Sequence, residues 1–160
     1  MQPDPMFPGE LAPGEGGTWY YPRDKGTGSN LWMTERSGVL AVILDGQPRK
    51  MLASEIESKL RRGREGKLTY GAGIEHDVEK MASTDDVLEL RLTRQLIEGG
   101  GSLHTRIYFN EPAARPGEML LLCIATKTPD APGKQQQNRH AALAETRLDS
   151  CHFEELPVAP

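Results

Sequence analysis

The strongest constraint on the fold is a change of hydrophobic period in the second half of the chain. Over residues 87–92, leucines alternate with Glu89 and Arg91, so a strand here would turn its leucines to one side and its charges to the other. Two further strand-like segments follow at residues 104–109 and 119–125, and each is bounded by Gly or Pro. Strands in close succession predict a small antiparallel sheet.

Periodic patterns elsewhere complete the expected architecture. After Pro48, apolar residues recur at every fourth position over residues 52–60, which predicts an amphipathic helix. A weaker apolar stripe predicts a second, short helix over residues 74–81, and a final helix is expected over residues 134–150. The continuous apolar run of residues 39–44 predicts a buried strand. The expected fold class is therefore α+β, with a small antiparallel sheet of about four strands, two N-terminal helices and one C-terminal helix.

The beginning of the chain differs in composition from the rest. Residues 1–37 contain five Pro and six Gly, and we expect a Pro/Gly-rich N-terminal arm there and a domain over residues 38–160. Both tryptophans of the chain and two of its four tyrosines nevertheless lie in this arm. Because so much aromatic surface is rarely left in water, residues 18–33 are expected to dock on the domain or on a partner, while residues 1–15 stay loose.

Charge and cysteine content exclude several classes of protein. A formal net charge of −4 disfavours a protein that coats itself in nucleic acid through bulk electrostatics. Cys123 and Cys151 form neither a disulfide framework nor a Cys/His zinc motif, so no metal and no cofactor are expected, and a reducing compartment fits. No segment is apolar for long enough to cross a bilayer, and the N-terminus lacks the pattern of a secretory signal, so we expect a cytoplasmic protein without a membrane partner.

Three motifs in the strand region follow one another in a specific order. Residues 87–92 read Val-Leu-Glu-Leu-Arg-Leu, residues 106–109 read Arg-Ile-Tyr-Phe, and residues 121–129 join an apolar strand to a Lys-Thr-Pro turn. In this order, and followed by a final helix, they resemble the RelE/HigB superfamily of bacterial toxins over residues 38–151. The resemblance implies a RelE-like fold and a ribosome-dependent endoribonuclease that cleaves mRNA without a metal. It also implies two kinds of partner, namely mRNA on the ribosome and an antitoxin protein that neutralises the activity.

The reaction that the resemblance implies is attack of a ribose 2′-hydroxyl on the neighbouring phosphate, which needs a proton acceptor, positive donors and a proton donor. Arg91 and Arg106 lie on successive predicted strands, and strand parity allows both to face one phosphate. Lys127 lies at the turn after the last strand, where its ammonium can neutralise a phosphate. The structural alternative is that both arginines are the solvated half of amphipathic strands and that Lys127 is an ordinary loop lysine.

Two histidines compete for the proton-transfer role. His152 stands near the C-terminus, where the resemblance places such a group, and His104 lies on a predicted strand in phase with one of the arginines. The alternative for each is a surface histidine without a chemical role. The candidate RNA-binding residues are Tyr108, which could stack on a base, and Lys134 and Arg139 of the final helix.

A second function, from a different class, fits part of the sequence. The turn carries Lys127 alone instead of consecutive basic residues, and residues 134–139 are mostly neutral. Together with the acidic net charge, these features favour a non-catalytic binding module on a RelE-like scaffold, such as a phage or mobile-element protein that engages a host protein. The two strand arginines and the order of the strands favour the endoribonuclease.

Overall fold

The computed structural model describes residues 16–73, 75–81 and 83–158 of the chain. Their elements are, in order, β1 (Thr18–Asp24), α2 (Leu31–Val42), α3 (Gln47–Arg64), β2 (Val78–Lys80), β3 (Leu88–Arg91), β4 (Gln95–Leu96), β5 (Ser102–Asn110), β6 (Glu118–Lys127), α4 (Ala131–Ser150) and β7 (Cys151–Glu155). The expected α+β class is confirmed. Of the helices in the described residues, none combines the length and the apolar character that a bilayer crossing requires.

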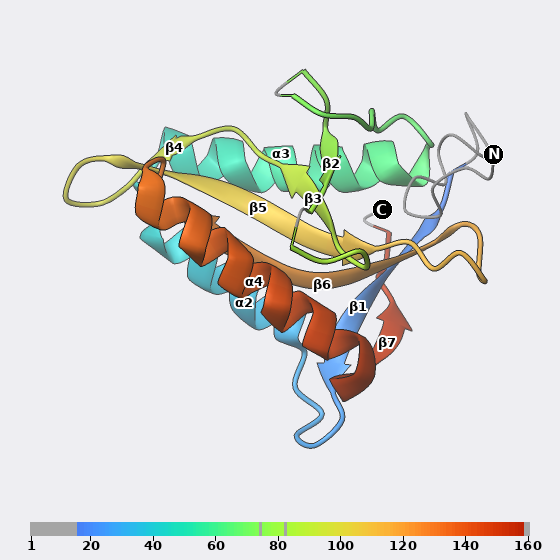
Figure 1. Cartoon of the computed structure of the whole chain (residues 1–160). Coiled ribbons are helices and arrows are strands. Elements are labelled where there is room, and N and C mark those ends of the chain that lie inside the picture. Colours follow the sequence, from blue (N-terminus) through green and yellow to red (C-terminus); the bar gives the residue numbers. More distant parts are fainter. Residues whose placement is uncertain (1–15, 74, 82, 159–160) are drawn as a thin grey trace.

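The strands form one mixed sheet (Figure 1). The strand order is β2-β3-β5-β6-β1-β7, with β4 paired to β5 beside this path. β1 runs parallel to β6, whereas the other paired strands run antiparallel. The expectation of about four antiparallel strands is therefore wrong in number and direction. The reason is that β1 and β7 extend the sheet beyond β6, and β2 extends it beyond β3.

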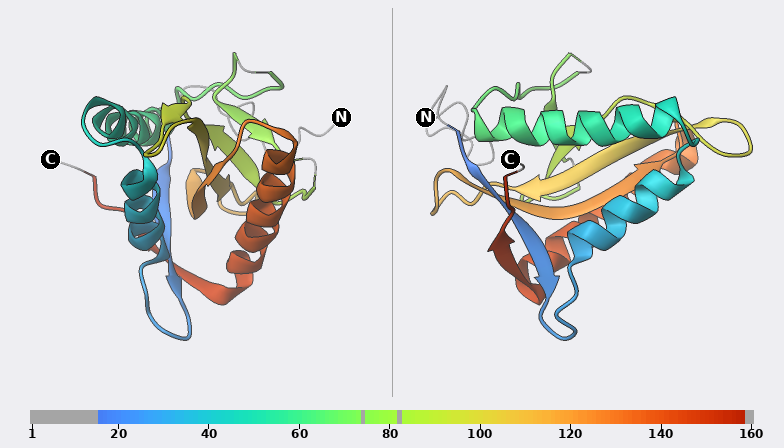
Figure 2. Two further views of the ribbon diagram at one scale, coloured as in Figure 1. Left: turned by 90° about the vertical axis from the view of Figure 1, so that its left-hand side faces the viewer. Right: turned by 180° about the vertical axis from the view of Figure 1, so that it is seen from behind.

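Helices cover both faces of the sheet. α2 and α3 pack on one face and α4 crosses the other (Figure 2). The larger core contains the leucines of β3 together with Leu52 and Ile56 of α3. The smaller core, under α4, contains Tyr108 of β5 and Ala141 of α4. The alternation of β3 thus decides what lies beneath α4: the leucines face α2 and α3, and the charged residues face α4.

β1 is fixed in the sheet by Trp19. Its side chain is 1% exposed, its Nε1 donates to the Leu60 carbonyl of α3 at 2.8 Å, and its ring lies edge-on to Phe109 at a centroid distance of 5.2 Å. α3 admits this ring because residue 63 is Gly, where an added Cβ would lie 2.7 Å from the indole. Both tryptophans are core residues, and the boundary expected after residue 37 falls inside α2. Residues 1–15, expected to be loose, lie outside the described residues.

Residues 39–44 are expected as a buried strand, but residues 39–42 instead form the end of α2, Ile43 is its C-cap and Leu44 follows it. Asn30 starts this helix by accepting a hydrogen bond from the Met33 amide at 3.0 Å. Within the run, only Val39 and Ile43 are fully buried, and their spacing of four is that of a helix face. A continuous apolar run does not distinguish a strand from a helix, and the helix cap decides between them here.

The second expected helix, over residues 74–81, is also wrong, since its described part contains strand β2. Asp77 fixes the chain just before this strand, because its carboxylate accepts hydrogen bonds from Lys59 and from the Thr69 amide. Val78 then pairs with Leu90 of β3. Long-range contacts of this kind override a weak local helical pattern.

β1 pairs with β6 only over residues 118–120, and beyond this point side chains take the place of the missing strand. Glu35 of α2 accepts a hydrogen bond from the Ile124 amide at 3.4 Å, and Arg147 of α4 donates to the Leu122 carbonyl at 2.8 Å. Arg147 also binds Glu35 through two hydrogen bonds, at 2.8 and 2.7 Å. This ion pair joins α2 to α4 around the edge of the sheet.

Candidate functional site

Four of the expected catalytic residues lie on one face of the sheet, beneath α4. In the β3–β5 pair, Arg91 lies opposite Arg106, and in the β5–β6 pair His104 lies opposite Lys127. Opposed residues in a sheet point to the same face, and His104 shares that face with Arg106 because the two are two positions apart. Strand register therefore forms a basic cluster from Arg91, His104, Arg106 and Lys127.

A buried carboxylate, Glu89, lies within the basic cluster. It is 2% exposed and forms ion pairs with Arg106 Nε at 3.5 Å and with Arg91 Nε at 3.8 Å. It also accepts a hydrogen bond from the Gln137 side chain of α4. Arg91 makes a second ion pair, with Glu79 of β2. Two carboxylates thus offset part of the positive charge of the basic cluster.

Arg106 is held more tightly than a solvated strand arginine would be. It is 8% exposed, and its Nη1 donates to the carbonyls of Leu92 at 3.2 Å and Thr105 at 2.9 Å. Its Nε is paired in charge with Glu89 but has no hydrogen-bond partner in the described part of the chain. Because β5 runs between β3 and β6 and under α4, Arg106 is buried, and the alternative of a solvated strand arginine does not apply to it.

Lys127 ends β6 and is half-buried. Its Nζ donates to the Gln137 side-chain oxygen at 2.7 Å, so that one amide of α4 bridges Lys127 and Glu89. Burial lowers the pKa of Lys127, and the charges of Arg106 and Arg91 lower it further against the opposing effect of Glu89. The first turns of α4 therefore lie directly on the basic cluster.

His104 is the best-placed proton acceptor of the basic cluster. It lies near the start of β5 and is half-buried. Burial lowers its pKa below the ordinary 6.5, and the positive charges of Arg106, Arg94 and Lys127 lower it further. The imidazole is therefore mainly neutral near pH 7, so one ring nitrogen can accept a proton. Arg94, which is exposed just after β3, was not among the expected residues. In the sequence, only its position shortly after the strand that carries Glu89 and Arg91 could have indicated it.

Tyr108 and His140 occupy the interior between the sheet and α4. Tyr108 is completely buried, and its ring centroid lies 5.9 Å from that of His140. Neither the Tyr108 hydroxyl nor His140 Nδ1 finds a hydrogen-bond partner among the described residues. Burial, and then the Glu89 charge, raise the pKa of Tyr108, so its hydroxyl stays protonated. A side chain without exposed surface cannot stack on a base, so that expectation for Tyr108 is wrong for this arrangement.

The remaining expected residues lie outside the basic cluster. His152 is exposed on β7, where it pairs with Arg23 of β1, and β1 and β6 separate this strand from β5. The strand order therefore rules out a shared site for His152 and the arginines. Lys134 and Arg139 are exposed on α4, the helix that covers the basic cluster.

No protein-family model, curated protein or solved structure matched the chain when it was compared with them. Among the residues that the structure describes, no group of three or more His, Cys, Asp or Glu side chains is arranged to hold a metal ion. What the basic cluster can do follows from its charges. The cations Arg91, Arg106 and Lys127 outnumber the carboxylates Glu79 and Glu89 that pair with them, which leaves positive charge for an anion such as a phosphate.

Proposed function

We propose that this chain is a toxin-type endoribonuclease that cleaves mRNA on the ribosome in the cytoplasm, without a metal, and that an antitoxin protein neutralises it. The observation that carries the proposal is the register of β3, β5 and β6, which aligns Arg91, Arg106, His104 and Lys127 on one face of the sheet. A neutral histidine among cations supplies two of the three groups that 2′-hydroxyl attack on a phosphate needs, a proton acceptor and positive donors. The RelE/HigB-like order of motifs supports the same activity.

In the proposed reaction, neutral His104 takes the proton of the ribose 2′-hydroxyl as its oxygen attacks the neighbouring phosphorus. Lys127 and Arg106 stabilise the negative charge that develops on the phosphate oxygens. The bond from phosphorus to the 5′-oxygen of the next nucleotide breaks, and that oxygen takes a proton from water. The products are a 2′,3′-cyclic phosphate and a 5′-hydroxyl, and His104 returns its proton to the solvent.

The position of α4 sets a condition on this reaction. Gln137 engages Lys127 and Glu89, and Arg106 is buried beneath the helix. A phosphate reaches Arg106 only when the first turns of α4 move away from the sheet. A dependence on the ribosome fits this condition, since a ligand that binds only the open arrangement shifts the population towards it.

Cleavage of mRNA on translating ribosomes tests the proposal. Purified wild-type protein, His104→Ala and His152→Ala are compared by mapping the 5′ ends of the mRNA. We expect His104→Ala to lower the cleavage rate by about 10²–10⁴-fold, because a positioned proton acceptor is lost, and His152→Ala to leave it unchanged. His152→Ala is the matched control, since it removes an imidazole from a distant strand. Absence of cleavage by wild-type protein that is free of any antitoxin would refute the proposal.

A non-catalytic binding module is the second candidate, and the burial of Arg106 favours it. This residue is 8% exposed, and its guanidinium already binds two carbonyls and pairs with Glu89. In such a module the basic cluster stabilises the packing of α4, and the chain acts by engaging a host protein. Normal growth on induced expression, together with intact mRNA, would select this candidate.

A further inference from the structure

β7 (Cys151–Glu155) is the last strand at one edge of the sheet, beside β1 (Figure 2). It pairs with β1 along one side, and no strand among the described residues pairs with its other side. The unpaired side of a strand offers amides and carbonyls to which a strand of another molecule can bind. Which strand fits depends on the backbone groups and side chains that β7 presents there.

The hydrogen bonds between β1 and β7 determine which backbone groups point to the free side. The Leu156 amide donates to the Trp19 carbonyl at 2.8 Å. At the other end of the strand pair, the Lys25 amide donates to the Ser150 carbonyl at 3.1 Å. Both bonds keep the register of the pair, in which hydrogen-bonded residues alternate with residues that point away. The even-numbered residues of β7 therefore bind β1, and its odd-numbered residues present their backbone groups to the free side.

Three residues of β7 point outward in this way, namely Cys151, Phe153 and Glu155. The Cys151 amide already donates to the Arg147 carbonyl at the end of α4, which leaves the Cys151 carbonyl free. Phe153 and Glu155 each present an amide and a carbonyl that form no hydrogen bond within the described part of the chain. Pro22 lies opposite Phe153 on β1, and its lack of an amide hydrogen fits a position that forms no bond to β7.

A second copy of β7 matches this free side in one antiparallel register, with Phe153 opposite the second copy's Phe153. In this register the two phenylalanines exchange both of their backbone hydrogen bonds, and each Glu155 amide donates to the Cys151 carbonyl of the other copy. His152 of each copy then lies opposite Glu154 of the other. This pair occupies a non-hydrogen-bonded position, where opposed side chains are closest.

Side-chain charge selects this register over its neighbours. His152 and Glu154 are both exposed, so across the junction each imidazole can donate a hydrogen bond to a carboxylate, and it attracts the carboxylate when protonated. The next registers of the same parity would instead place Glu154 opposite itself or His152 opposite itself. Like charges directly opposed destabilise a strand pair, whereas a histidine opposite a carboxylate stabilises it.

The other face of the junction is apolar at its centre. Phe153 is half-buried and packs against the smaller core, on the face of the sheet that α4 covers. Because Phe153 lies at the centre of the proposed register, the two copies bring their phenyl rings together and remove apolar surface from water. The two copies are therefore complementary in backbone groups, in charge on one face and in apolar surface on the other.

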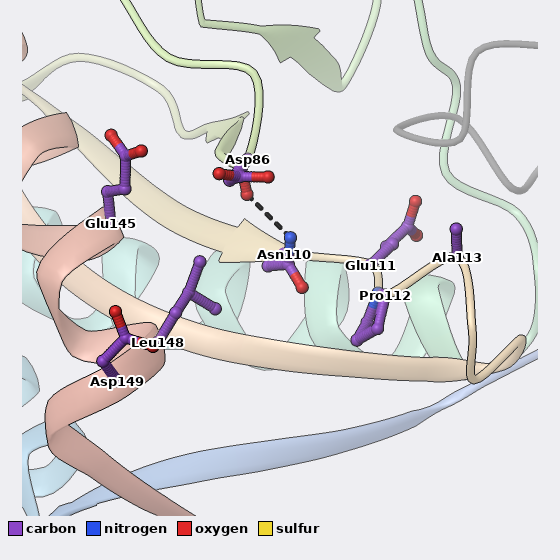
Figure 3. A pocket seen from close by; sticks show the side chains of 8 residues that line it. All are labelled: Asp86, Asn110, Glu111, Pro112, Ala113, Glu145, Leu148 and Asp149. Atoms are coloured by element: carbon purple, nitrogen blue, oxygen red, sulfur yellow. Dashed lines mark hydrogen bonds between the residues drawn. The ribbon is translucent and has the colours of Figure 1, made fainter.

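The carboxylates in the last turns of α4 do not oppose such a junction. Glu145 and Asp149 line a pocket together with Asn110, at the end of β5 (Figure 3). In the sheet, β6 and β1 lie between β5 and β7. Two copies of a chain with a net charge of −4 can therefore meet at β7 without setting these two carboxylates against each other.

We propose that two copies of this chain associate through antiparallel pairing of their β7 strands, centred on Phe153, so that one sheet continues through both copies. The junction is short, so the association is weak compared with that of an obligate dimer. It does not depend on the proposed nuclease activity, because β1 and β6 separate β7 from β5 and the basic cluster.

Sedimentation equilibrium of the full chain over a range of concentrations tests the proposal. The junction variant is His152→Glu, which sets carboxylates against each other where His152 and Glu154 of the two copies would meet. Within one chain, the new carboxylate lies opposite Arg23 of β1, so the fold should persist. The control variant, Gln135→Glu, adds the same charge at an exposed position on α4.

We expect wild-type protein to form dimers in a concentration-dependent manner. His152→Glu should raise the dimer dissociation constant at least about tenfold and Gln135→Glu less than about twofold, because only the first replaces attraction across the junction by repulsion. Wild-type protein that stays monomeric up to about 1 mM would overturn the proposal in favour of a strand of another protein. Equal dissociation constants for the two variants would overturn it in favour of a different dimer surface.

Disulfide cross-linking tests the register, and it remains decisive if His152→Glu does not fold. His152→Cys and Glu154→Cys are incubated in air separately and as a mixture, and wild type, whose two cysteines are buried, is the control. In the proposed register, residue 152 of one copy and residue 154 of the other have Cα atoms about 4.5 Å apart, whereas identical positions lie about 8 Å apart, too far for a disulfide. The mixture should therefore form the linked dimer at least about tenfold faster than either variant alone. Equal rates, or no linked dimer in the mixture, would overturn the proposed pairing.

Discussion

Arg106→Ala tests whether the basic cluster contributes to the stability of the fold. The substitution removes two hydrogen bonds to carbonyls and the ion pair with Glu89, which is 2% exposed. Removing one partner of a buried ion pair lowers the free energy of unfolding by about 3–5 kcal/mol when the other charge is left alone. Glu89 keeps Arg91 and Gln137 as partners. We therefore expect a loss at the lower limit, about 3 kcal/mol.

Urea unfolding followed by circular dichroism measures this loss for Arg106→Ala, Glu89→Gln and the double variant. If the loss in Arg106→Ala comes from an uncompensated Glu89 charge, neutralising that charge should recover part of it. The double variant should then lose less stability than the sum of the single variants, by about 1–3 kcal/mol. Strictly additive losses, or a loss below about 0.5 kcal/mol in Arg106→Ala, would refute the view that the two residues form one buried pair.

Two further predictions concern stability. Gly63→Ala should lower the free energy of unfolding by about 1–3 kcal/mol, because its Cβ would lie 2.7 Å from the Trp19 ring. Gly38→Ala in α2, where an added Cβ meets no other described part of the chain within 4 Å, should raise the free energy of unfolding by about 0.5–1 kcal/mol. If the denaturation curves of Gly63→Ala and Gly38→Ala moved in the same direction, the packing of β1 on α3 would be contradicted. Because burial raises the pKa of Glu111 from 4.5 to about 7, its contribution to stability is greatest below pH 4.5 and is lost as the pH rises through 7. The free energy of unfolding, measured by urea titration, should therefore fall more between those pH values in wild type than in Glu111→Gln, by roughly 2–3 kcal/mol. Parallel pH dependences of the two proteins would disprove the raised pKa.

The strands and helices with strong local periodicity could be predicted from the sequence. The alternation over β3 and the four-residue spacing of Leu52, Ile56 and Leu60 are local signals, and the structure has a strand and a helix there. β1 has no such signal, because it contains Pro22 and follows a run rich in Pro and Gly. Its strand state depends on pairing with β6, whose partner for Trp19 is Met119. Pairing over such a separation is not visible in a local pattern.

The sequence could predict that the residues of the candidate site share one face of the sheet, but it could not predict that α4 buries them. Parity places Arg91 on the face opposite the leucines of its own strand and allows Arg106 to share that face, and the register has the two directly opposed. What parity cannot show is the helix that covers them, since Gln137 and His140 reach the sheet only through the packing of α4. His152 is close to the end of α4 in sequence, but β7 turns it onto the far edge of the sheet.

The ion pair between Glu35 and Arg147 has a consequence for self-association. An unpaired length of strand is a template on which a strand of another molecule can add, and these two side chains occupy the Ile124 amide and the Leu122 carbonyl that such a strand would use. The pair is separated by 112 positions in sequence, so this protection exists only when both helices are docked. Movement of the first turns of α4 alone would leave Arg147, in the last turn, in place. If the whole helix lifted, Arg147 would release the Leu122 carbonyl, whereas Glu35 of α2 would still bind the Ile124 amide. A chain with the whole of α4 lifted would therefore expose a free carbonyl on β6 to a strand of another molecule, and it would be more prone to aggregation than the closed chain.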